Sequence, residues 1–230
     1  LQDTLDDVCR RSLSSVGVDG DESTSDMAVA LASDVIPTST DDFHDALGAV
    51  AAQLAHHLVR NGEGTNHVVR LALVSEDLHP DVERAIARDV LNGPLLKCAV
   101  AGNDPNVGRL VGKLGQVLGK RAADVPRDLL DHATVALGGD VIFDHGNFQL
   151  DAEKELRLKA HLEAAMLGPP DLGLPGKSSG DDYPAHGRCV EIHVDLRPRD
   201  RRSAISRPPT VVLGSDLTHQ YVTENADYRS

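Results

Sequence analysis

The stretch at residues 16–26, VGVDGDESTSD, gathers the side chains in this sequence that most suggest chemistry. An EF-hand calcium loop requires Gly at its sixth position and Glu at its twelfth. Counted from Asp19, those positions hold Thr24 and Ala30, so the calcium interpretation fails. Two interpretations remain open. The acids and hydroxyls could satisfy the free backbone N–H groups of a helix start, or they could form part of a site for a cationic substrate.

Other residues capable of chemistry form no recognised motif. None of the 11 histidines belongs to an HExxH pattern, and adjacent His56 and His57 would point about 100° apart on a helix. The arginine-rich segment 197–207 suits either an anion site or a solvated hairpin tip. No P-loop is present. These general metal-binding and catalytic motifs therefore assign no function to the chain.

Composition and charge exclude several classes of protein. Aromatic residues are 3% of the chain and Trp is absent, which argues against base stacking on single-stranded nucleic acid. The net charge of −13 opposes contact with phosphate backbones. No stretch approaches the ~18 apolar residues of a membrane span. The cysteines are widely spaced and form no CxxC pair, which predicts a reducing, cytoplasmic setting without disulfides or a zinc ribbon; they are Cys9, Cys98 and Cys189.

Four stretches, in the same order, resemble the ornithine acetyltransferases, the bifunctional glutamate N-acetyltransferase family of arginine biosynthesis. VGVDGDESTSD resembles that family's Val-Asp-Gly-Asp-Thr-Ser-Thr-Asn-Asp signature, and NGEG at 61–64 resembles its Gly-Glu-Gly segment. PLLKCAVAGNDPNVGR at 94–109 is similar to its Asp-Pro-Asn-Trp-Gly-Arg block, and SDLTHQYVTENADYRS at 215–230 to its ending. The resemblance covers essentially the whole chain and is weakest between 121 and 209.

The resemblance implies a precursor that cuts itself before a Thr into an α chain and a β chain. The new N-terminal Thr of the β chain is then the nucleophile. Residues 1–230 are expected to be one β-chain unit without that Thr, which would lie upstream of Leu1; a division into two lobes near 121–131 is an option. Thr4 lies inside the first expected helix and is not the equivalent residue. No catalytic residue and no metal ligand is therefore expected in this chain.

Three positions correspond to substrate-binding residues of the resembled family: Glu63, Asn225 and Ser230. A carboxylate on a tight glycine turn approaches an ammonium closely, which suits the side-chain amine of ornithine. Two plainer interpretations stay open, with Glu63 a solvated turn acid and Asn225 a turn former. The acidic stretch is then expected to shape the wall of this site rather than to act as a ligand set.

The implied reaction moves an acetyl group from N-acetylornithine to the Thr and then to glutamate. No cofactor is implied, and acetyl-CoA is an alternative acetyl donor. The chain departs from the family at Val107, where the family has Trp, at His67, where it has Lys, and at Glu224, where it has an apolar residue. Segments 168–187 and 197–207 resemble insertions. A related self-cleaving acyltransferase or amidohydrolase with another amino-acid substrate therefore remains an alternative, as does an inactive fragment that only associates with a partner chain.

The elements that must position these residues follow from hydrophobic periodicity and capping signals. Helices are expected at 1–13, 23–35 with a Ser23/Asp26 capping box, 41–60 with Asp41 as cap, 79–93, 105–120 with Asp104 as cap, and 151–166. Strands are expected at 16–18, 67–74, 189–196 and 210–222, with a hairpin around Gly138 and Gly139.

Mixed helices and strands without an internal repeat predict one compact α/β unit. The resemblance implies more: an αββα sandwich of four layers, similar to N-terminal-nucleophile hydrolases. It also implies an (αβ)₂ heterotetramer with the α chain from the same precursor, and small amino-acid substrates rather than nucleic acid or membrane as the remaining partners.

Overall fold

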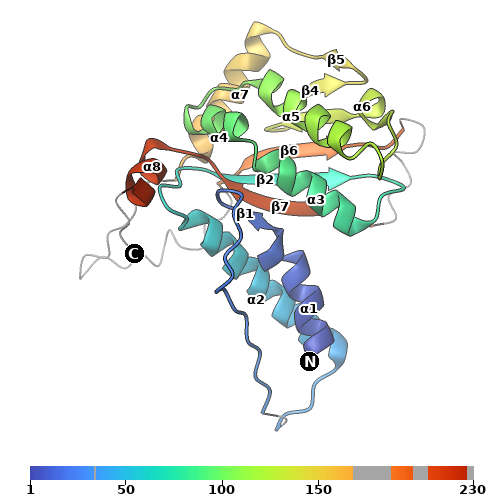
Figure 1. Ribbon diagram of the computed structural model, residues 1–230, viewed down its shortest axis with the longest axis vertical. Helices are drawn as coiled ribbons and strands as arrows, with labels where there is room; N and C mark the ends of the chain where they lie inside the picture. The colour runs from blue at the N-terminus through green and yellow to red at the C-terminus, as the bar shows by residue number, and fades with distance from the viewer. Residues whose placement is uncertain (34, 168–187, 199–206, 227–230) are drawn as a thin grey trace.

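The computed structural model describes residues 1–33, 35–167, 188–198 and 207–226. Within them the chain forms α-helices and strands in mixed order (Figure 1). The helices are α1 Gln2–Arg11, α2 Thr40–Arg60, α3 Pro80–Leu91, α4 Pro94–Ala101, α5 Val107–Lys120, α6 Leu129–His132, α7 Ala152–Ala165 and α8 His219–Ala226, with a 3₁₀ turn at Leu13–Ser15. The strands are β1 Val16–Gly17, β2 Val68–Val74, β3 Thr134–Leu137, β4 Asp140–Asp144, β5 Asn147–Phe148, β6 Val190–Asp195 and β7 Thr210–Ser215.

The strands form one mixed seven-stranded sheet in the order β1-β7-β2-β6-β3-β4-β5. β2 lies between β7 and β6, antiparallel to β7 and parallel to β6. β1 adds to the outer side of β7 in parallel, with Val16 opposite Leu213. This arrangement brings residues 16–19, which follow the first helix, beside the end of β7 near the C-terminus.

One face of the sheet carries the main hydrophobic core. Alternate residues of β2 point to this face and are buried against α3, α5 and α7; they are Val69, Leu71 and Leu73. The alternation is the expected consequence of the two-residue period of a strand. Figure 1 shows α3, α4 and α5 gathered on this side of the sheet.

Within the described residues, the other face of the sheet is covered by a helix near β7 and β2. There Val68 and Leu213 pack against Ala55 and Val59 of α2, in a small second cluster. Farther along this face the side chains are polar, with Arg70 paired to Glu191 at 3.1 Å. In Figure 1 the α1–α2 pair projects away from the sheet and its covering helices.

The sequence predictions of β1, β2, α1, α3, α7 and the β3–β4 hairpin are confirmed. The strand predicted at 210–222 is too long, since β7 ends at Ser215 and α8 begins at His219. The predicted cap Asp104 is wrong, since Asn106 caps α5 by accepting from the backbone N–H of Arg109 at 3.2 Å. Asp41 is likewise not the cap of α2, which begins after Ser39. The predicted helix at 23–35 is wrong: residues 26–33 belong to no helix or strand. In residues 27–32, large apolar side chains alternate with alanines, a period of two that does not fit a helix. The helix prediction followed the spacing of Ser23 and Asp26 instead.

The α/β class is confirmed, in the form of a mixed sheet with helices. In the described residues all strands belong to that one sheet, so the four layers implied by the resemblance are not displayed by this part of the chain. Val125, Leu129 and Leu130, within the suggested lobe boundary, pack in the main core. Among the described helices none is both long enough and apolar enough to cross a bilayer.

Candidate substrate-binding site

Glu63 lies on the turn that joins α2 to β2. Gly64, the next residue, has φ of +64°, a left-handed conformation that favours glycine. A Cβ at Gly64 would overlap the backbone nitrogen of Tyr221, because the start of α8 lies directly on this turn. Thr218 links this turn to the segment before α8, since its hydroxyl donates to the Gly64 carbonyl at 2.6 Å. The sequence signal for the site, a Glu between two glycines, is therefore also the condition for close packing of α8.

The structure brings together two of the three residues that the resemblance implied. The Asn225 side-chain amide donates to a Glu63 carboxylate oxygen at 2.5 Å and to the Tyr221 carbonyl at 3.0 Å. Glu63 and Asn225 are 162 positions apart in the chain and both are exposed. Ser230 lies outside the described residues. The contact places a carboxylate and an amide on one accessible surface, where both remain available to a ligand.

Tyr221 joins the acidic stretch to this pair, a connection that the sequence analysis missed. Its hydroxyl donates to a carboxylate oxygen of Asp19 at 3.0 Å, across 202 positions of sequence. Burial raises the pKa of Tyr221, and the bond to Asp19 and the negative charges of Glu63 and Asp21 raise it further. The phenol therefore stays protonated as a donor. Tyr221 lies four residues before Asn225, a helical spacing that could have signalled one shared face.

The acidic stretch is neither a calcium loop nor a helix start. Asp19 accepts from the backbone N–H of Asp21 at 2.9 Å, which closes a local turn. In the described parts of the chain, no group of three His, Cys, Asp or Glu side chains is arranged to hold a metal. The carboxylates of Asp19 and Glu63, which both act on Tyr221, make this wall electronegative and suit recognition of an ammonium.

A buried His–Asp pair anchors the base of the turn. His67 is fully buried, and its Nδ1 lies 2.8 Å from an Asp216 carboxylate oxygen. The other oxygen of Asp216 accepts from the backbone N–H of Asn66 at 2.9 Å. His67 Nε2 lies 3.2 Å from the Leu162 carbonyl. Because the carboxylate and the carbonyl can only accept, this geometry suits donation from both ring nitrogens. His67 is therefore a buried, hydrogen-bonded side chain at a position where the resembled family carries Lys.

Lys97 connects the end of β1 to the end of β7. It lies on α4, is 3% exposed, and its ammonium donates to the Ser215 carbonyl at 2.6 Å and the Val18 carbonyl at 2.8 Å. The Gly17 carbonyl is 3.4 Å away. Lys97 thus joins the end of β1 to the end of β7, the two segments that continue into Asp19 and α8.

The charge state of Lys97 is sensitive to this environment. Burial lowers the pKa of Lys97 to about 8, while the carboxylates of Asp216 and Asp19 act in the opposite direction. Neither Lys97 nor the His67–Asp216 pair was identified from the sequence, because their partners are distant along the chain. Cys189, by contrast, has a pKa raised to about 11, mainly by burial, and is not a thiolate nucleophile.

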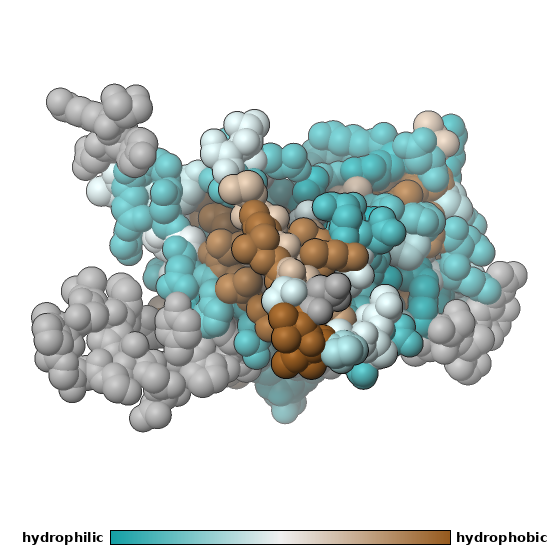
Figure 2. Space-filling view, turned by 90° about the horizontal axis from the view of Figure 1, so that it is seen from below, coloured by the Kyte–Doolittle hydropathy of each residue, from teal (hydrophilic) through white to brown (hydrophobic). Residues whose placement is uncertain are grey.

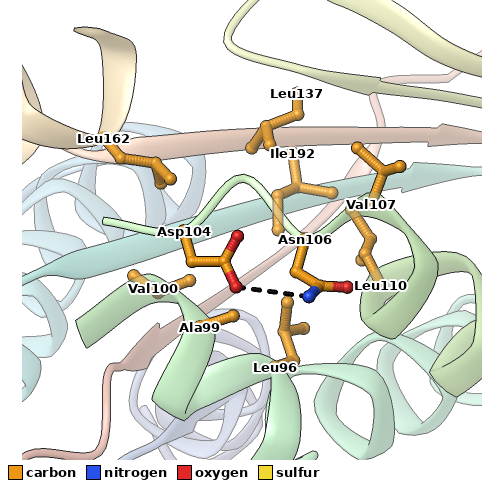
Figure 3. Close-up of a pocket in the computed structure, with 10 residues that line it drawn as sticks. All are labelled: Leu96, Ala99, Val100, Asp104, Asn106, Val107, Leu110, Leu137, Leu162 and Ile192. Atoms are coloured by element: carbon orange, nitrogen blue, oxygen red, sulfur yellow. Dashed lines mark hydrogen bonds between the residues drawn. The ribbon is translucent and has the colours of Figure 1, made fainter. Parts of the chain in front are cut away.

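A small cavity lies elsewhere, between α4, α5 and the sheet (Figure 3). Its lining is mostly aliphatic, and Asp104 and Asn106 point toward one another at its edge, 3.2 Å apart. Asn106 also caps α5. The Asp-Pro-Asn motif therefore has a structural role, since it connects α4 to α5. Val107, which departs from the resembled family, lines the same cavity and is buried in the main core.

Comparison with known proteins decides the family. The ArgJ family model matches residues 1–230. The chain belongs to the ArgJ family. It is 32% identical over 239 residues to the arginine biosynthesis bifunctional protein ArgJ of Gluconobacter oxydans, covering 100% of this chain and 47% of that protein. It is 31% identical over 240 residues to the glutamate N-acetyltransferase of Methanopyrus kandleri, covering 100% of this chain and 51% of that protein. The resemblance seen in the four motifs is thereby confirmed at the level of the family.

A solved relative supports the fold. The crystal structure of the arginine biosynthesis bifunctional protein ArgJ from Bacillus halodurans matches with a TM-score of 0.72 at 24% identity, over 99% of this chain and 92% of that chain. This likeness concerns the fold, which is mixed α/β in this ArgJ-family chain. The chain spans about half the length of the curated relatives that it matches. What the whole protein does is therefore a matter of proposal.

Proposed function

We propose that this chain is the β-chain part of a glutamate N-acetyltransferase of arginine biosynthesis. In the reaction, the hydroxyl of a Thr outside this sequence attacks the acetyl carbonyl of N-acetylornithine. The acetyl–nitrogen bond breaks, the hydroxyl proton passes through a base to the departing amine, and ornithine leaves. The amine of glutamate then attacks the acetyl-threonine, so that N-acetylglutamate forms and the Thr hydroxyl is restored. Acetyl-CoA is an alternative donor for the first step.

The single observation that carries this proposal is the contact of Glu63 with Asn225 on an electronegative wall, in a chain of the ArgJ family. Glu63 would bind the charged side-chain amine of ornithine, since a carboxylate and an ammonium form a strong charge-assisted hydrogen bond. Asn225 would hold the carboxylate in position and offer its amide oxygen to the substrate. Ser230, beyond the described residues, is proposed to close the same site.

The Thr chemistry is supported by general physical arguments. A hydroxyl is a weak nucleophile, and the free N-terminal amine of a chain that begins with Thr is a suitable base. An oxyanion hole then stabilises the tetrahedral intermediate, which is commonly worth about 3 kcal/mol per donor. Both parts are assigned to polypeptide outside residues 1–230, the oxyanion hole to the α chain. The proposed assembly is the (αβ)₂ heterotetramer, with the four-layer sandwich completed by that chain.

The test uses the full-length precursor, incubated with N-acetylornithine and glutamate while ornithine and N-acetylglutamate are measured. Glu63→Gln is expected to raise KM for N-acetylornithine about 10- to 100-fold, because it removes the charge that pairs with the ammonium. Glu224→Gln is the matched control: Glu224 lies on α8 beside Asn225 but bonds to Gln220. Absence of ornithine release by the unaltered protein would refute the proposal.

A second candidate is an acyltransferase or amidohydrolase of the same self-cleaving type with another amino-acid substrate. The observation that favours it is His67, which replaces the family's Lys within hydrogen-bonding distance of Asp216, below the site. Val107, the other marked departure, lies in the core and bears less on specificity. Mass spectrometry of the nucleophile-bearing chain after exposure to a panel of acyl-amino acids separates the candidates. An acyl adduct from a donor other than N-acetylornithine would favour the second. An intact precursor that takes up no acyl group would indicate an inactive associating chain.

A further inference from the structure

Helix α8, which carries Tyr221 and Asn225, is not held in place by a buried apolar face. None of its residues, all of which the structure describes, is buried. Figure 2, seen from below, shows exposed apolar side chains gathered where Figure 1 places the α1–α2 pair. The position of α8 therefore depends on hydrogen bonds, and above all on those of residues 215–218, which lead into it from β7.

Residues 215–218 are bonded to two other parts of the chain. Two of these residues bond to the segment 64–67 that follows Glu63, as described above. The other two bond to Lys97 of α4. The backbone N–H of Leu217 donates to the Lys97 carbonyl at 3.4 Å, and the Ser215 carbonyl accepts from the Lys97 ammonium at 2.6 Å. Lys97 thus holds this connection with both its backbone and its side chain.

The same ammonium also binds the start of the acidic stretch. It donates to the carbonyls of Val18 at 2.8 Å and Gly17 at 3.4 Å. Asp19 is the next residue, and its carboxylate accepts from the Tyr221 hydroxyl. An ammonium has three protons and no lone pair, and three backbone carbonyls take up these protons. The buried amine is therefore neither a base nor a nucleophile here, and its role is to hold two segments together.

We propose that Lys97 is a positioning residue for the substrate site, whose ammonium holds the acidic stretch and α8 where Asn225 contacts Glu63. The inference rests on the proposed function, because this site is the one proposed to bind N-acetylornithine. A neutral amine has only two protons and directs a lone pair at the third carbonyl oxygen. Loss of the proton from Lys97 therefore breaks one bond of the junction and replaces it with a repulsion.

Two carboxylates act on the Lys97 ammonium, one from each of the joined segments. Burial lowers the pKa of Lys97 to about 8, while Asp216, which follows β7, and Asp19, which follows β1, favour its charged form. α5 also packs against α4, but its Arg109 donates to the Leu95 carbonyl instead. Raising the pH from 7 to 9 therefore removes the proton from Lys97 in most molecules.

The two carboxylates have titratable partners of their own, His67 on Asp216 and Tyr221 on Asp19. The pKa of Tyr221 is raised from its ordinary value of 10, chiefly by burial, so the phenol keeps its proton over this range. The side-chain amine of N-acetylornithine is an alkylamine with a pKa of about 10.4, as in Lys, and stays charged. Comparison with a Lys97 variant separates the effect of Lys97 from that of His67.

The first part of the test measures KM and kcat for N-acetylornithine in the full-length, processed protein from pH 7 to 9. A group with a pKa of about 8 keeps its proton in about 10% of molecules at pH 9. KM should therefore rise about 10-fold over this range if only the charged form positions the site. Lys97→Met should raise KM at pH 7 by about 10-fold and make it independent of pH, with kcat unchanged at each pH.

Lys154→Met is the matched control. The Lys154 ammonium also joins two backbone carbonyls, those of Val141 at 2.8 Å and Gln149 at 2.6 Å, but beside β4 and β5 at the other edge of the sheet. It should leave KM and its pH dependence unchanged. A level KM from pH 7 to 9 in the unaltered protein would overturn the inference, whether or not Lys97→Met folds. A rise in KM that persists in Lys97→Met would overturn it as well.

The second part measures amide hydrogen exchange of residues 216–226 without substrate. Lys97→Met is expected to speed their exchange about 10-fold relative to Lys154→Met, while residues 68–74 of β2 stay as slow as in that control. Equal exchange of residues 216–226 in the two variants would show that Lys97 does not hold α8. Because exchange requires no catalysis, a folded protein that releases no ornithine would refute the proposed function, and this comparison would still decide the role of Lys97.

Discussion

The sheet with α3, α5 and α7 differs from the region formed by residues 1–60 in one physical respect. The first region buries large aliphatic side chains on all sides, with Leu71, Leu73 and Leu114 fully buried. In the second, α2 buries mainly Ala51, Ala55 and Val59, and its larger residues face outward. The first region is a complete core, whereas the second presents apolar surface that nothing in the described chain covers. The four predictions below test this difference, from the largest expected effect to the smallest.

The largest effect is expected where the first region buries a charge. Glu83 is fully buried and accepts from Ser75, Thr210 and the Arg207 guanidinium at 2.6–2.8 Å. Glu83→Ala should lower the free energy of unfolding by about 4 kcal/mol, because it leaves these donors without their acceptor. Urea titration measures the loss. Asp45→Ala on exposed α2 is the control, expected to stay within about 0.5 kcal/mol; a similar loss in both variants would contradict the contrast.

Cavity-forming substitutions give the next largest effect. Leu73→Ala in β2 is expected to lower the free energy of unfolding of the 230-residue chain by about 3 kcal/mol. Leu54→Ala in α2 is expected to change it by less than about 0.5 kcal/mol, because Leu54 is already half-exposed. Both are read from urea midpoints. If Leu54→Ala cost as much as Leu73→Ala, the outward-facing residues of α2 would be buried within the chain.

Lys97, where the two regions meet, predicts an unusual pH dependence. Its folded pKa of about 8 lies below its ordinary value of 10.5, so the unfolded chain binds more protons between these values. Stability from this group therefore rises with pH from 8 to 10.5, by up to about 3 kcal/mol at 1.36 kcal/mol per pKa unit. Lys97→Met should abolish this rise in urea titrations. Identical pH slopes for the two proteins would show that the charge of Lys97 does not oppose folding.

The smallest effect is expected within the second region. The bond between Asp7 and His44 joins α1 to α2 and is the main cause that lowers the pKa of Asp7 and raises that of His44. Stability from His44 is present below the ordinary His pKa and lost as pH rises through its folded value. Stability from Asp7 is present above the ordinary Asp pKa and lost as pH falls through its folded value.

The pair therefore stabilises most between roughly pH 4 and 6.5. Asp7→Asn should reduce the fall in urea midpoint between pH 5.5 and 8, by a small amount because both groups are accessible to solvent. If Asp7→Asn leaves the fall in urea midpoint between pH 5.5 and 8 unchanged, a group other than this pair causes that fall.

The two regions also differ in how well the sequence predicted them. The apolar run of β2 and the capped, periodic α3 are both found where their local patterns placed them. Residues 23–35 were wrongly predicted as a helix, because a capping-box spacing is a local signal that does not by itself form a helix without packing of one face. Glu63 and Asn225 were identified only through resemblance to a family. Tyr221, Lys97 and the His67–Asp216 pair act through contacts between distant positions, for which a single sequence gives no spacing rule.

The contrast between a complete core and an uncovered surface is tested most directly by amide hydrogen exchange of residues 27–33 and 68–74. In the isolated chain, β2 should exchange slowly and residues 27–33 at nearly unprotected rates. Protection of residues 27–33 in the isolated chain equal to that of residues 68–74 would contradict this account.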